Sequence, residues 1–361
     1  MKTWQLLKQD PDLFERYFVK EYIIKAIRIF FELKKYHELE SPILTPVLPQ
    51  ERYMDPLRVD LELTMPEAGK KGQRIKEEVY ITPTTERYNK VMLAAGLGEH
   101  FVITKVARAM EDISPNHGAE FTMLEWYHLN ADYKDIMNDT EDLIIFIIDY
   151  LKKHSKLPQY KNEDYKITFQ GQEIDFAKGW ERLSIPEALI KYADVKLEDI
   201  QTLGQIKDFV KRRGHLVNGI EDWQALFELI FLTYIEPNIV KAKPTFIYDF
   251  PRILGPLTKP NKDNPLVCEK VELYIAGKEI ANGYTELTDG NLLEQNFKIE
   301  QQAREKLGKA PVAFDQDLVD AVRSGMPEVG GIGMGLDRLA MIFADAKNIS
   351  EVNFFPATDW F

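Results

Sequence analysis

The chain of 361 residues has almost no cysteine and no long apolar run. Its single thiol, Cys268, permits neither an internal disulfide nor a cysteine-based metal site, which suits a reducing compartment. The longest apolar run, Leu143 to Ile148, is far too short to cross a bilayer. The first residues carry charges throughout, and they lack the apolar stretch and cleavage site of a secretory signal. We therefore expect a cytoplasmic protein without a membrane partner.

A surplus of basic residues is also missing. Lys and Arg number 46 against 58 Asp and Glu, which gives a formal net charge of -12 at pH 7. Because phosphate backbones are bound by clustered cations, tRNA and DNA are not the first partners to expect, although a local basic patch is compatible with this balance. The composition, 45% hydrophobic and 29% charged, is that of a soluble globular protein.

Hydrophobic periodicity predicts strands placed around a helical segment. The expected strands are 79–84, 100–110, 120–129, 245–250, 271–287 and the glycine-rich 330–335. The expected helices are 11–37, 85–98, 139–153 and 292–309, together with a helix that follows residue 335. Helix-like patterns dominate 184–235, so we predict a small helical insertion at about 156–240, and we expect 51–78 to be a mobile loop. This order favours an α+β fold with an antiparallel sheet flanked by helices.

The segment HGAEFTMLEWY, residues 117–127, contains a carboxylate in an unusual place. In a strand Phe121, Met123, Glu125 and Tyr127 share one side, which looks like the buried side. An ionised carboxylate there is costly unless it is paired, and this strand contains no Lys or Arg. The partner of Glu125 must come from elsewhere in the chain, or from a ligand.

Further polar residues lie near this strand and before it. Arg108 ends the preceding strand, where it could hold a phosphate or carboxylate, and Phe121 offers a flat face for a base. The intervening loop contains Glu111 and His117. Each feature alone has an ordinary explanation, such as a surface ion pair for Arg108. Together with Glu125 they predict a pocket for a charged ligand.

The segment 271–287 adds Glu272, Glu279 and Glu286, and opposed carboxylates on a hairpin suit a hard cation such as Mg²⁺. Glu279 and Glu286 differ in parity, so both face the pocket only if a bulge intervenes, and 282–283 is a natural place for it. The alternative is a solvated outer face with an ordinary tight turn at 282–283.

Three stretches resemble the signature motifs of the class II aminoacyl-tRNA synthetases. ELESPIL, which includes Pro42, resembles motif 1; residues 108–120 with EFTMLEWY resemble motif 2; and GIGMGLDRL resembles motif 3. EFTMLEWY together with KEIANGYTELTD resembles the lysyl branch of the class. IEPNIVKAKPTFIYDFP is similar to the truncated lysyl-tRNA synthetase paralogues that attach (R)-β-lysine to elongation factor P. The resemblance runs from about residue 12 to the end of the sequence.

For ATP, the resemblance implies a single catalytic domain over residues 1–361 that dimerises through motif 1. Arg108 would hold the α-phosphate and the substrate carboxylate, and His117 would touch the distal phosphates. Phe121 would stack on adenine, with Arg338 on its other face and near the γ-phosphate. Glu111 would contact adenine. Arg108 and Arg338 would thus be the catalytic residues, and the implied magnesium ligands are Glu272 and Glu279.

For the amino acid, the resemblance implies that Glu86 meets the substrate amino group and that Asn282 helps to hold the backbone end. Glu125, Tyr127 and Glu286 would receive the side-chain ammonium. Gly333 matches true lysyl-tRNA synthetases, where the elongation-factor enzymes often carry alanine, so the choice between lysine and β-lysine stays open.

The predicted function is therefore ATP-dependent activation of lysine or β-lysine as its adenylate, followed by transfer to a lysine side chain of elongation factor P. Attack of the carboxylate on the α-phosphorus needs no protein nucleophile, so positioning and charge neutralisation would supply the catalysis. About forty residues precede Pro42, which we expect to be too few for an N-terminal anticodon-binding barrel. The alternatives are charging of tRNA, a stand-alone amide synthetase and a catalytically silent regulatory paralogue.

Overall fold

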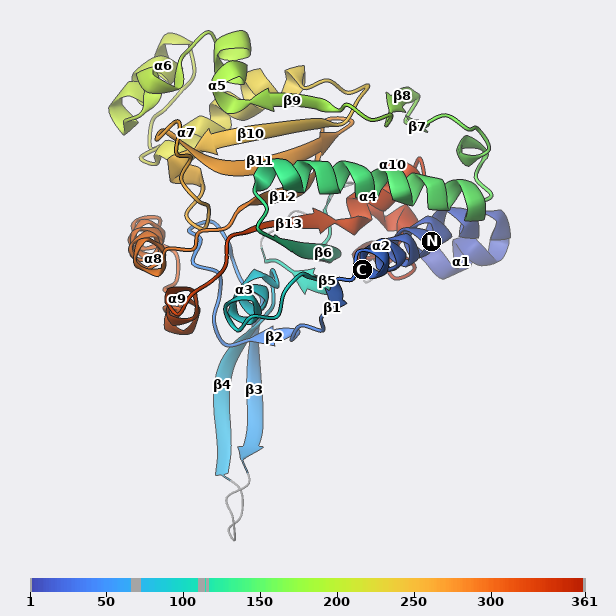
Figure 1. Cartoon of the computed structure of the whole chain (residues 1–361), viewed down its shortest axis with the longest axis horizontal. Helices are drawn as coiled ribbons and strands as arrows, with labels where there is room; N and C mark the ends of the chain where they lie inside the picture. Colours follow the sequence, from blue (N-terminus) through green and yellow to red (C-terminus); the bar gives the residue numbers. More distant parts are fainter. Residues whose placement is uncertain (1, 66–72, 110–113, 115–116, 360–361) are drawn as a thin grey trace.

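A computed structural model of the chain describes every residue except 1, 66–72, 110–113, 115–116 and 360–361. Within the described residues, eight strands form the main sheet in the order β1-β5-β6-β13-β12-β11-β10-β9 (Figure 1). In chain order these strands are β1 His37–Glu38, β5 His100–Ala107, β6 Glu120–Leu129, β9 Glu181–Ser184, β10 Thr245–Pro251, β11 Val267–Ile275, β12 Lys278–Thr285 and β13 Val329–Gly335.

Pairing in this sheet is antiparallel from β5 through to β10. It is parallel only at the two ends, where β1 meets β5 and β9 meets β10. The α+β class and the antiparallel core predicted from the sequence are confirmed. Because β6 pairs with β13, residues from the first and last parts of the chain lie side by side at the centre of the sheet.

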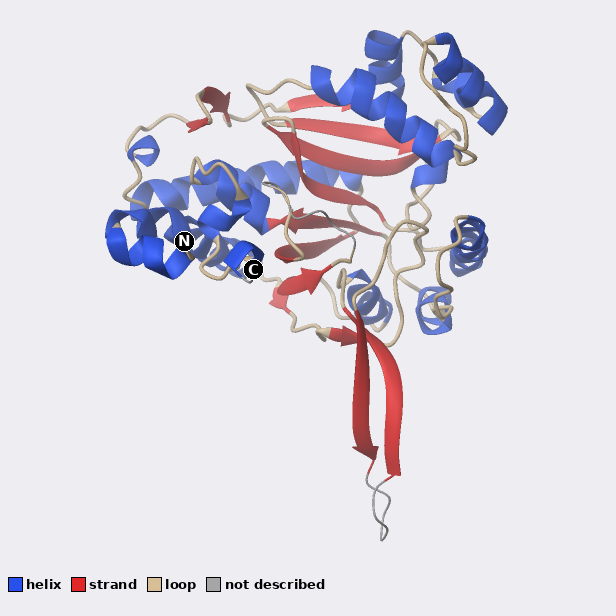
Figure 2. Ribbon diagram, turned by 180° about the vertical axis from the view of Figure 1, so that it is seen from behind, coloured by secondary structure: helices blue, strands red, loops and turns tan. Residues whose placement is uncertain are grey.

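One face of the sheet is covered by three helices, α2 Phe14–Leu33, α4 Tyr133–His154 and α10 Leu336–Phe343 (Figure 2). Helix α4 begins at an Asp132 cap, whose side chain accepts hydrogen bonds from two backbone N–H groups of the first turn. Its apolar stripe is buried in the same hydrophobic cluster as Leu124 and Trp126, which point to this face from β6. Burying each such side chain contributes about 1.5–3 kcal/mol, so this layer supplies most of the hydrophobic stability near β6.

The opposite face of β6 turns towards α3 Glu86–Ala94, α8 Gly290–Lys306 and α9 Gln316–Arg323. Leu93, Leu293, Phe297 and Val319 from these helices form an apolar cluster with Tyr127 of the sheet. The cluster covers only part of this face, and the remainder borders a cavity. Among the described residues, none of the helices combines the length and the apolar character that a membrane span requires.

Residues 156–240 only partly match the predicted helical insertion. The region begins with a two-stranded hairpin, β7 Lys166–Phe169 and β8 Gln172–Asp175, and then contributes β9 to the main sheet. Helices follow, among them α5 Ile185–Ala188, α6 Leu203–Arg212 and α7 Trp223–Ile230, and they bury their apolar faces against β10 and β11. The helical pattern predicted for 184–235 is confirmed. The prediction that the helical region extends back to about residue 156 is wrong. That the region is an insertion stays a prediction.

The prediction of a mobile loop at 51–78 is wrong for residues 58–65 and 73–78, which form strands. Strands β3 Arg58–Met65 and β4 Gln73–Ile81 pair antiparallel, and they extend from the body as a two-stranded ribbon (Figures 1 and 2). Val59 and Leu61 are half-buried while Arg58, Asp60 and Glu62 are exposed, which is a strand alternation that charged neighbours obscured. At the base of the ribbon, β4 also pairs with β2 Leu44–Thr45. The remaining helix, α1 Thr3–Gln9, precedes α2.

Candidate active site

A cavity of about 430 Å³ borders the face of β6 that does not meet α4. Its size lies in the range of small-molecule binding sites. The side chains predicted to share one side of β6 all line it, namely Phe121, Met123, Glu125 and Tyr127. The other predicted site residues that line it are Glu86, Arg108, His117, Glu279, Asn282, Glu286 and Arg338. The alternation of side chains along β6 therefore predicted correctly which face of this strand borders the cavity.

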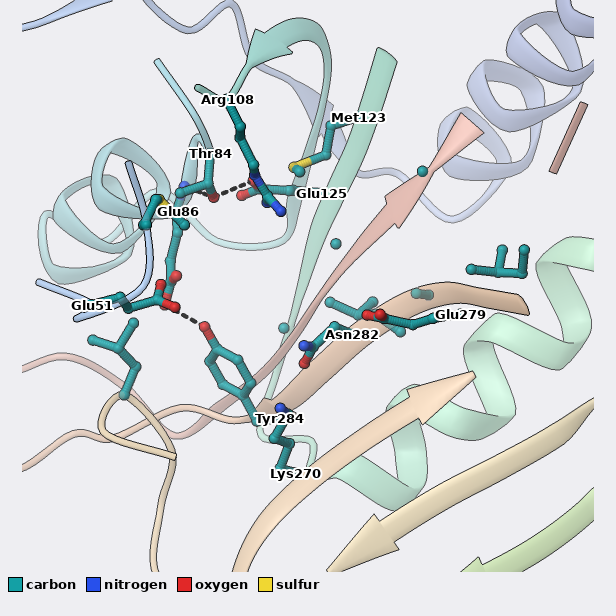
Figure 3. Close-up of a pocket in the computed structure, with 18 of the residues that line it drawn as sticks. Glu51, Thr84, Glu86, Arg108, Met123, Glu125, Lys270, Glu279, Asn282 and Tyr284 are labelled. Carbon is teal, nitrogen blue, oxygen red and sulfur yellow. Dashed lines mark hydrogen bonds between the residues drawn. The ribbon is translucent and has the colours of Figure 1, made fainter. Parts of the chain in front are cut away.

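Glu125 is 4% exposed and is held by uncharged donors (Figure 3). Its Oε1 accepts hydrogen bonds from Thr84 Oγ1 at 2.7 Å and from the Thr85 backbone N–H at 2.9 Å. Its Oε2 accepts from Asn89 Nδ2 at 3.1 Å. Burial raises the pKa of the Glu125 carboxyl, and the hydrogen bonds from Thr84 and Thr85 oppose the rise. A cationic ligand would favour the ionised form further.

The other carboxylate predicted at the ammonium end, Glu286, already has a cation beside it. Lys90 Nζ lies 2.6 Å from Glu286 Oε2, and the same ammonium pairs with Glu86 one helical turn earlier on α3. Burial lowers the pKa of Lys90, but its two carboxylate partners more than offset this and raise it. Burial also raises the pKa of Glu286, which the ammonium of Lys90 opposes. Two buried carboxylates thus share one lysine, which leaves this group with net negative charge.

A β-bulge brings Glu279 of β12 to the same pocket face as Glu286, which follows β12, as their parity requires. Glu272 of β11 pairs with Asn282, whereas Tyr274, on the same face, pairs with Glu279. Two residues of β11 therefore oppose three of β12, and the additional residue is Ile280. The bulge exists, but its predicted position at Asn282–Gly283 is wrong.

Gly283 has a different role from the one expected. A Cβ on Gly283 would lie 2.6 Å from the Gly331 carbonyl oxygen and from Ile332 Cβ, so the glycine permits β13 to approach closely. The neighbouring Gly331 is constrained in the same way, because a Cβ there would lie 2.4 Å from Glu286 Oε1. Gly331 thus makes room for the Glu286 carboxylate, whereas Gly330 lets α4 approach, since a Cβ there would lie 2.6 Å from Ile136 Cγ1.

Glu272 and Glu279 lie on the same face after the bulge, but in different surroundings. Glu279 lines the cavity, and burial together with the negative charge of Glu272 raises the pKa of Glu279 to about 7. Glu272 is buried behind it, where Lys270 Nζ lies 2.9 Å from Oε1 and Tyr274 donates a hydrogen bond of 3.0 Å to Oε2. Among the described residues no cluster of three metal-ligating side chains occurs. Two carboxylates and substrate oxygens would have to complete a magnesium shell.

The residues predicted to bind nucleotide surround the other part of the cavity. The Arg108 guanidinium carbon lies 5.3 Å from the centre of the Phe121 ring, and Arg108 Nε lies 3.4 Å from the Pro83 carbonyl oxygen. Arg338 Nη1 donates to the Glu279 carbonyl oxygen at 2.8 Å, so the bulge also orients this guanidinium. His117 Nδ1 lies 3.0 Å from Ser114 Oγ. Glu111 lies outside the described residues.

Asp337 fixes the start of α10, and with it the position of Arg338. Its carboxylate accepts from the Thr122 backbone N–H at 2.6 Å and from Lys20 Nζ at 2.7 Å. The Asn282 side chain presents a buried Oδ1 that, within the described part of the chain, has no hydrogen-bond partner. This oxygen can accept a hydrogen bond from a molecule in the cavity, which Asn282 lines.

Sequence reasoning missed several polar residues of the site, Thr84 among them. Glu51, Lys270 and Tyr284 line the cavity, and Lys90 lies directly behind it. The Tyr284 hydroxyl donates to Glu86 Oε1 at 2.6 Å (Figure 3). The alternation of side chains in a strand was a usable signal for Tyr284, because it follows Asn282 by two positions in β12 and so shares its face. Lys90 carried a weaker signal, its i, i+4 spacing from Glu86, and Glu51 carried none.

The sheet, the bulged carboxylate hairpin and the arginine pair are those of a class II synthetase catalytic domain. The family model described as tRNA synthetases class II (D, K and N) matches residues 4–359, and the chain belongs to this family.

Among curated relatives, the chain is similar to three bacterial lysine-tRNA ligases. The enzyme of Clostridium tetani is 30% identical over 356 residues, which is 96% of this chain and 65% of that protein. The enzyme of Legionella pneumophila strain Paris is 31% identical over 98% of this chain and 67% of its own length. That of Magnetococcus marinus is 32% identical over 92% and 62%, respectively. The chain thus spans about two thirds of the length of the curated relatives it matches.

Proposed function

We propose that the protein activates lysine or β-lysine with ATP and transfers the resulting acyl group to a lysine side chain of elongation factor P. The observation that carries the first half is the set of buried carboxylates at one end of the cavity. Among the described residues, Glu125 is 4% exposed and accepts hydrogen bonds from uncharged donors, and the nearby Glu286 shares Lys90 with Glu86. A second ammonium is the ligand that balances this charge.

The other end of the cavity supports adenylate formation. In the first step the substrate carboxylate attacks the α-phosphorus of ATP, and pyrophosphate leaves. Arg108 would neutralise charge at the α-phosphate, Phe121 would stack on the adenine, and Arg338 would hold the distal phosphates. These groups position and neutralise, and no protein nucleophile is required. His117 and Glu111 are proposed as further ATP contacts.

Magnesium is proposed at Glu272 and Glu279, and the carboxylates fit it in part. The two share a face, and the raised pKa of Glu279 reflects burial and an adjacent like charge, which a divalent cation would relieve. Lys270 already balances Glu272, so Glu279 would be the principal protein ligand. When bound, the cation would neutralise phosphate charge during the transfer.

At the reactive end of the amino acid, Glu86 and Asn282 would hold the amino group and the backbone. The uncharged Tyr284 hydroxyl fixes the Glu86 carboxylate at 2.6 Å, so this carboxylate is pre-oriented. Tyr127 would contribute its hydroxyl beside Glu125, since the two oxygens lie 3.5 Å apart. Lysine and β-lysine both carry two ammonium groups, which would pair with Glu86 and Glu125.

Elongation factor P is proposed as the acceptor because of two features of the sequence. The segment 235–251 resembles the elongation-factor branch, and the net charge of -12 offers little general attraction for a nucleic acid. The second candidate is charging of tRNA, which the lysine-tRNA ligase relatives favour. A homodimer, implied by the motif 1 resemblance around Pro42, remains part of the proposal.

The test combines ATP-pyrophosphate exchange with an acceptor assay. Lysine or β-lysine should drive exchange, while neutral and acidic amino acids should not, because they leave Glu125 facing an apolar or repulsive group. Enzyme, ATP, Mg²⁺ and each isomer are then incubated with elongation factor P or with total tRNA. A mass gain on the factor supports the proposal. Efficient tRNA charging without that gain contradicts it, and exchange with neither acceptor favours a small-molecule amide synthetase.

A further inference from the structure

The segment 50–55 forms one wall of the cavity without regular secondary structure, yet it is held firmly. The Arg52 backbone N–H and Nε donate to Glu300 Oε2 at 3.1 and 3.0 Å, and Nη1 lies 3.1 Å from Asp222 Oδ1. Arg304 Nη1 donates to the Met54 carbonyl oxygen at 2.8 Å. On the other side of Glu51, Gln301 Nε2 of α8 donates to Gln50 Oε1 at 3.0 Å. This clamp fixes the backbone from which the Glu51 side chain enters the pocket.

The Glu51 carboxylate lies at the reactive end of the cavity, beside that of Glu86 (Figure 3). The charged groups that face it are Glu86 from α3, Arg108 after β5, Lys270 of β11 and Glu300 of α8. Glu51 is partly exposed, so a group that enters from solvent can reach it. Neither the resemblance nor the proposed function assigns it a role.

The acidic residues of the pocket form a row in which Glu86 lies between Glu51 and Glu125 (Figure 3). A bound lysine has two ammonium groups, which the positions of Glu125 and Glu86 accommodate. The amino group of β-lysine lies one carbon nearer to the side-chain ammonium, so it moves away from Glu51 rather than towards it. Neither isomer explains the Glu51 carboxylate on the far side of Glu86, where the charge of Arg108 still acts on it.

We propose that Glu51 is a catalytic residue for the second step, in which it binds the acceptor ammonium and removes its proton. This inference rests on the proposed function, because it requires an amine as the acceptor. The ammonium first passes one proton to the Glu51 carboxylate. The neutral nitrogen then attacks the carbonyl carbon of the adenylate, the bond from that carbon to the phosphate oxygen breaks, and AMP leaves with the electron pair. The second proton leaves the new amide nitrogen to water.

The surroundings of Glu51 raise the basicity of its carboxylate. Burial and the adjacent negative charge of Glu86 raise the pKa of the Glu51 carboxyl, while Arg108 and Lys270 limit the rise. A raised pKa makes the carboxylate a better proton acceptor than an ordinary surface glutamate. A hydroxyl acceptor would reach this site uncharged, and it would gain less from a carboxylate there.

The test separates activation from transfer in single-turnover experiments with Glu51→Gln. Enzyme-bound lysyl adenylate is formed with ATP and Mg²⁺, and it is then mixed with n-butylamine, which is protonated at neutral pH, or with hydroxylamine, which is largely uncharged. Pyrophosphate exchange is measured in parallel, and each transfer rate is expressed per enzyme-bound adenylate. Transfer to butylamine should fall by roughly 10²-fold to 10⁴-fold, and transfer to hydroxylamine should change little. Glu51→Asp should restore part of the lost rate.

The pH dependence adds a readout that a structural role would not move. The wild-type advantage over Glu51→Gln should grow as pH rises through the pKa of Glu51, because only the ionised carboxylate accepts a proton. Equal rates of transfer to butylamine in wild type and Glu51→Gln would overturn the inference about Glu51. The proposed function would stand in that case, provided that both proteins form the adenylate. A variant that loses exchange and lysine affinity together would also overturn it, since Glu51 would then bind the amino acid. Absence of adenylate in the wild type would overturn both.

Discussion

The Glu125→Gln variant tests the lysine pocket most directly, because it removes one charge and almost no volume. Glu125 is 4% exposed, so water does not replace a lost ion pair. Loss of one partner of a buried charge-assisted pair costs about 2–5 kcal/mol. At about 1.36 kcal/mol per tenfold, this corresponds to roughly a 30-fold to 5,000-fold higher lysine requirement. The ATP requirement should change by less than about threefold, because the nucleotide residues lie at the other end of the cavity.

The hydrogen bonds of Glu125 also set the expected effect on stability. A glutamine can accept from Thr84 and Thr85 through its oxygen, but its amide nitrogen then faces the Asn89 donor, now 3.1 Å from Oε2. One unsatisfied buried donor costs about 1–3 kcal/mol of unfolding free energy. A matched control is Glu141→Gln. Glu141 lies on α4, is also buried, and accepts a hydrogen bond from the Gly179 N–H at 2.7 Å.

The assay is lysine-dependent ATP-pyrophosphate exchange at saturating ATP, with thermal unfolding measured on each variant. Glu141→Gln should keep the wild-type lysine requirement, even if its unfolding temperature falls. An unchanged lysine requirement in folded Glu125→Gln would refute the assignment of this carboxylate to the ammonium. A loss of ATP binding in the same variant would refute the assignment of lysine and ATP to separate ends of the cavity.

Three further predictions concern charge. Glu279→Ala should abolish exchange at any Mg²⁺ concentration while leaving the far-ultraviolet circular dichroism unchanged; normal activity of this variant in EDTA-treated buffer would exclude the metal site. Lys90→Met should lower the unfolding free energy by about 3–5 kcal/mol in urea melts, because its two buried carboxylate partners lose their shared cation. The hydrogen bond to Asp139 raises the pKa of His128, so this pair should stabilise the fold below the ordinary His pKa and lose that contribution as pH rises through the raised value. His128→Gln should flatten this part of the pH profile, and a parallel profile would contradict the pairing.

How much of the site could be predicted depended on the range of the interaction. The alternation along β6 is local, so the pocket side of Glu125 followed from the sequence. The need for a bulge between Glu279 and Glu286 was also local, but its position was not. Register with β11 and β13 decides which residue is left unpaired, and no property of Ile280 signals that it is the one.

The errors in the fold have a similar origin. Charged residues interrupt the apolar alternation in the sequence of β3 and β4, so the segment looked like a loop. In the sequence, the role of Lys90 was indicated only by its position four residues after Glu86 in a predicted helix. Its second partner, Glu286, is distant in the sequence. Glu51 owes its position to a clamp made by α8, which nothing in its neighbouring sequence announces.

The clamp on segment 50–55 also bears on when the pocket can form during synthesis. Arg52 and Glu300 are 248 positions apart, and β6 must wait for β13 before its central pairing exists. A nascent chain that has left the ribosome as far as α7 therefore has an open sheet edge and an untethered pocket wall. Such edges invite pairing with other chains, so chaperone binding during translation should be concentrated on β6 until α8 and β13 have emerged.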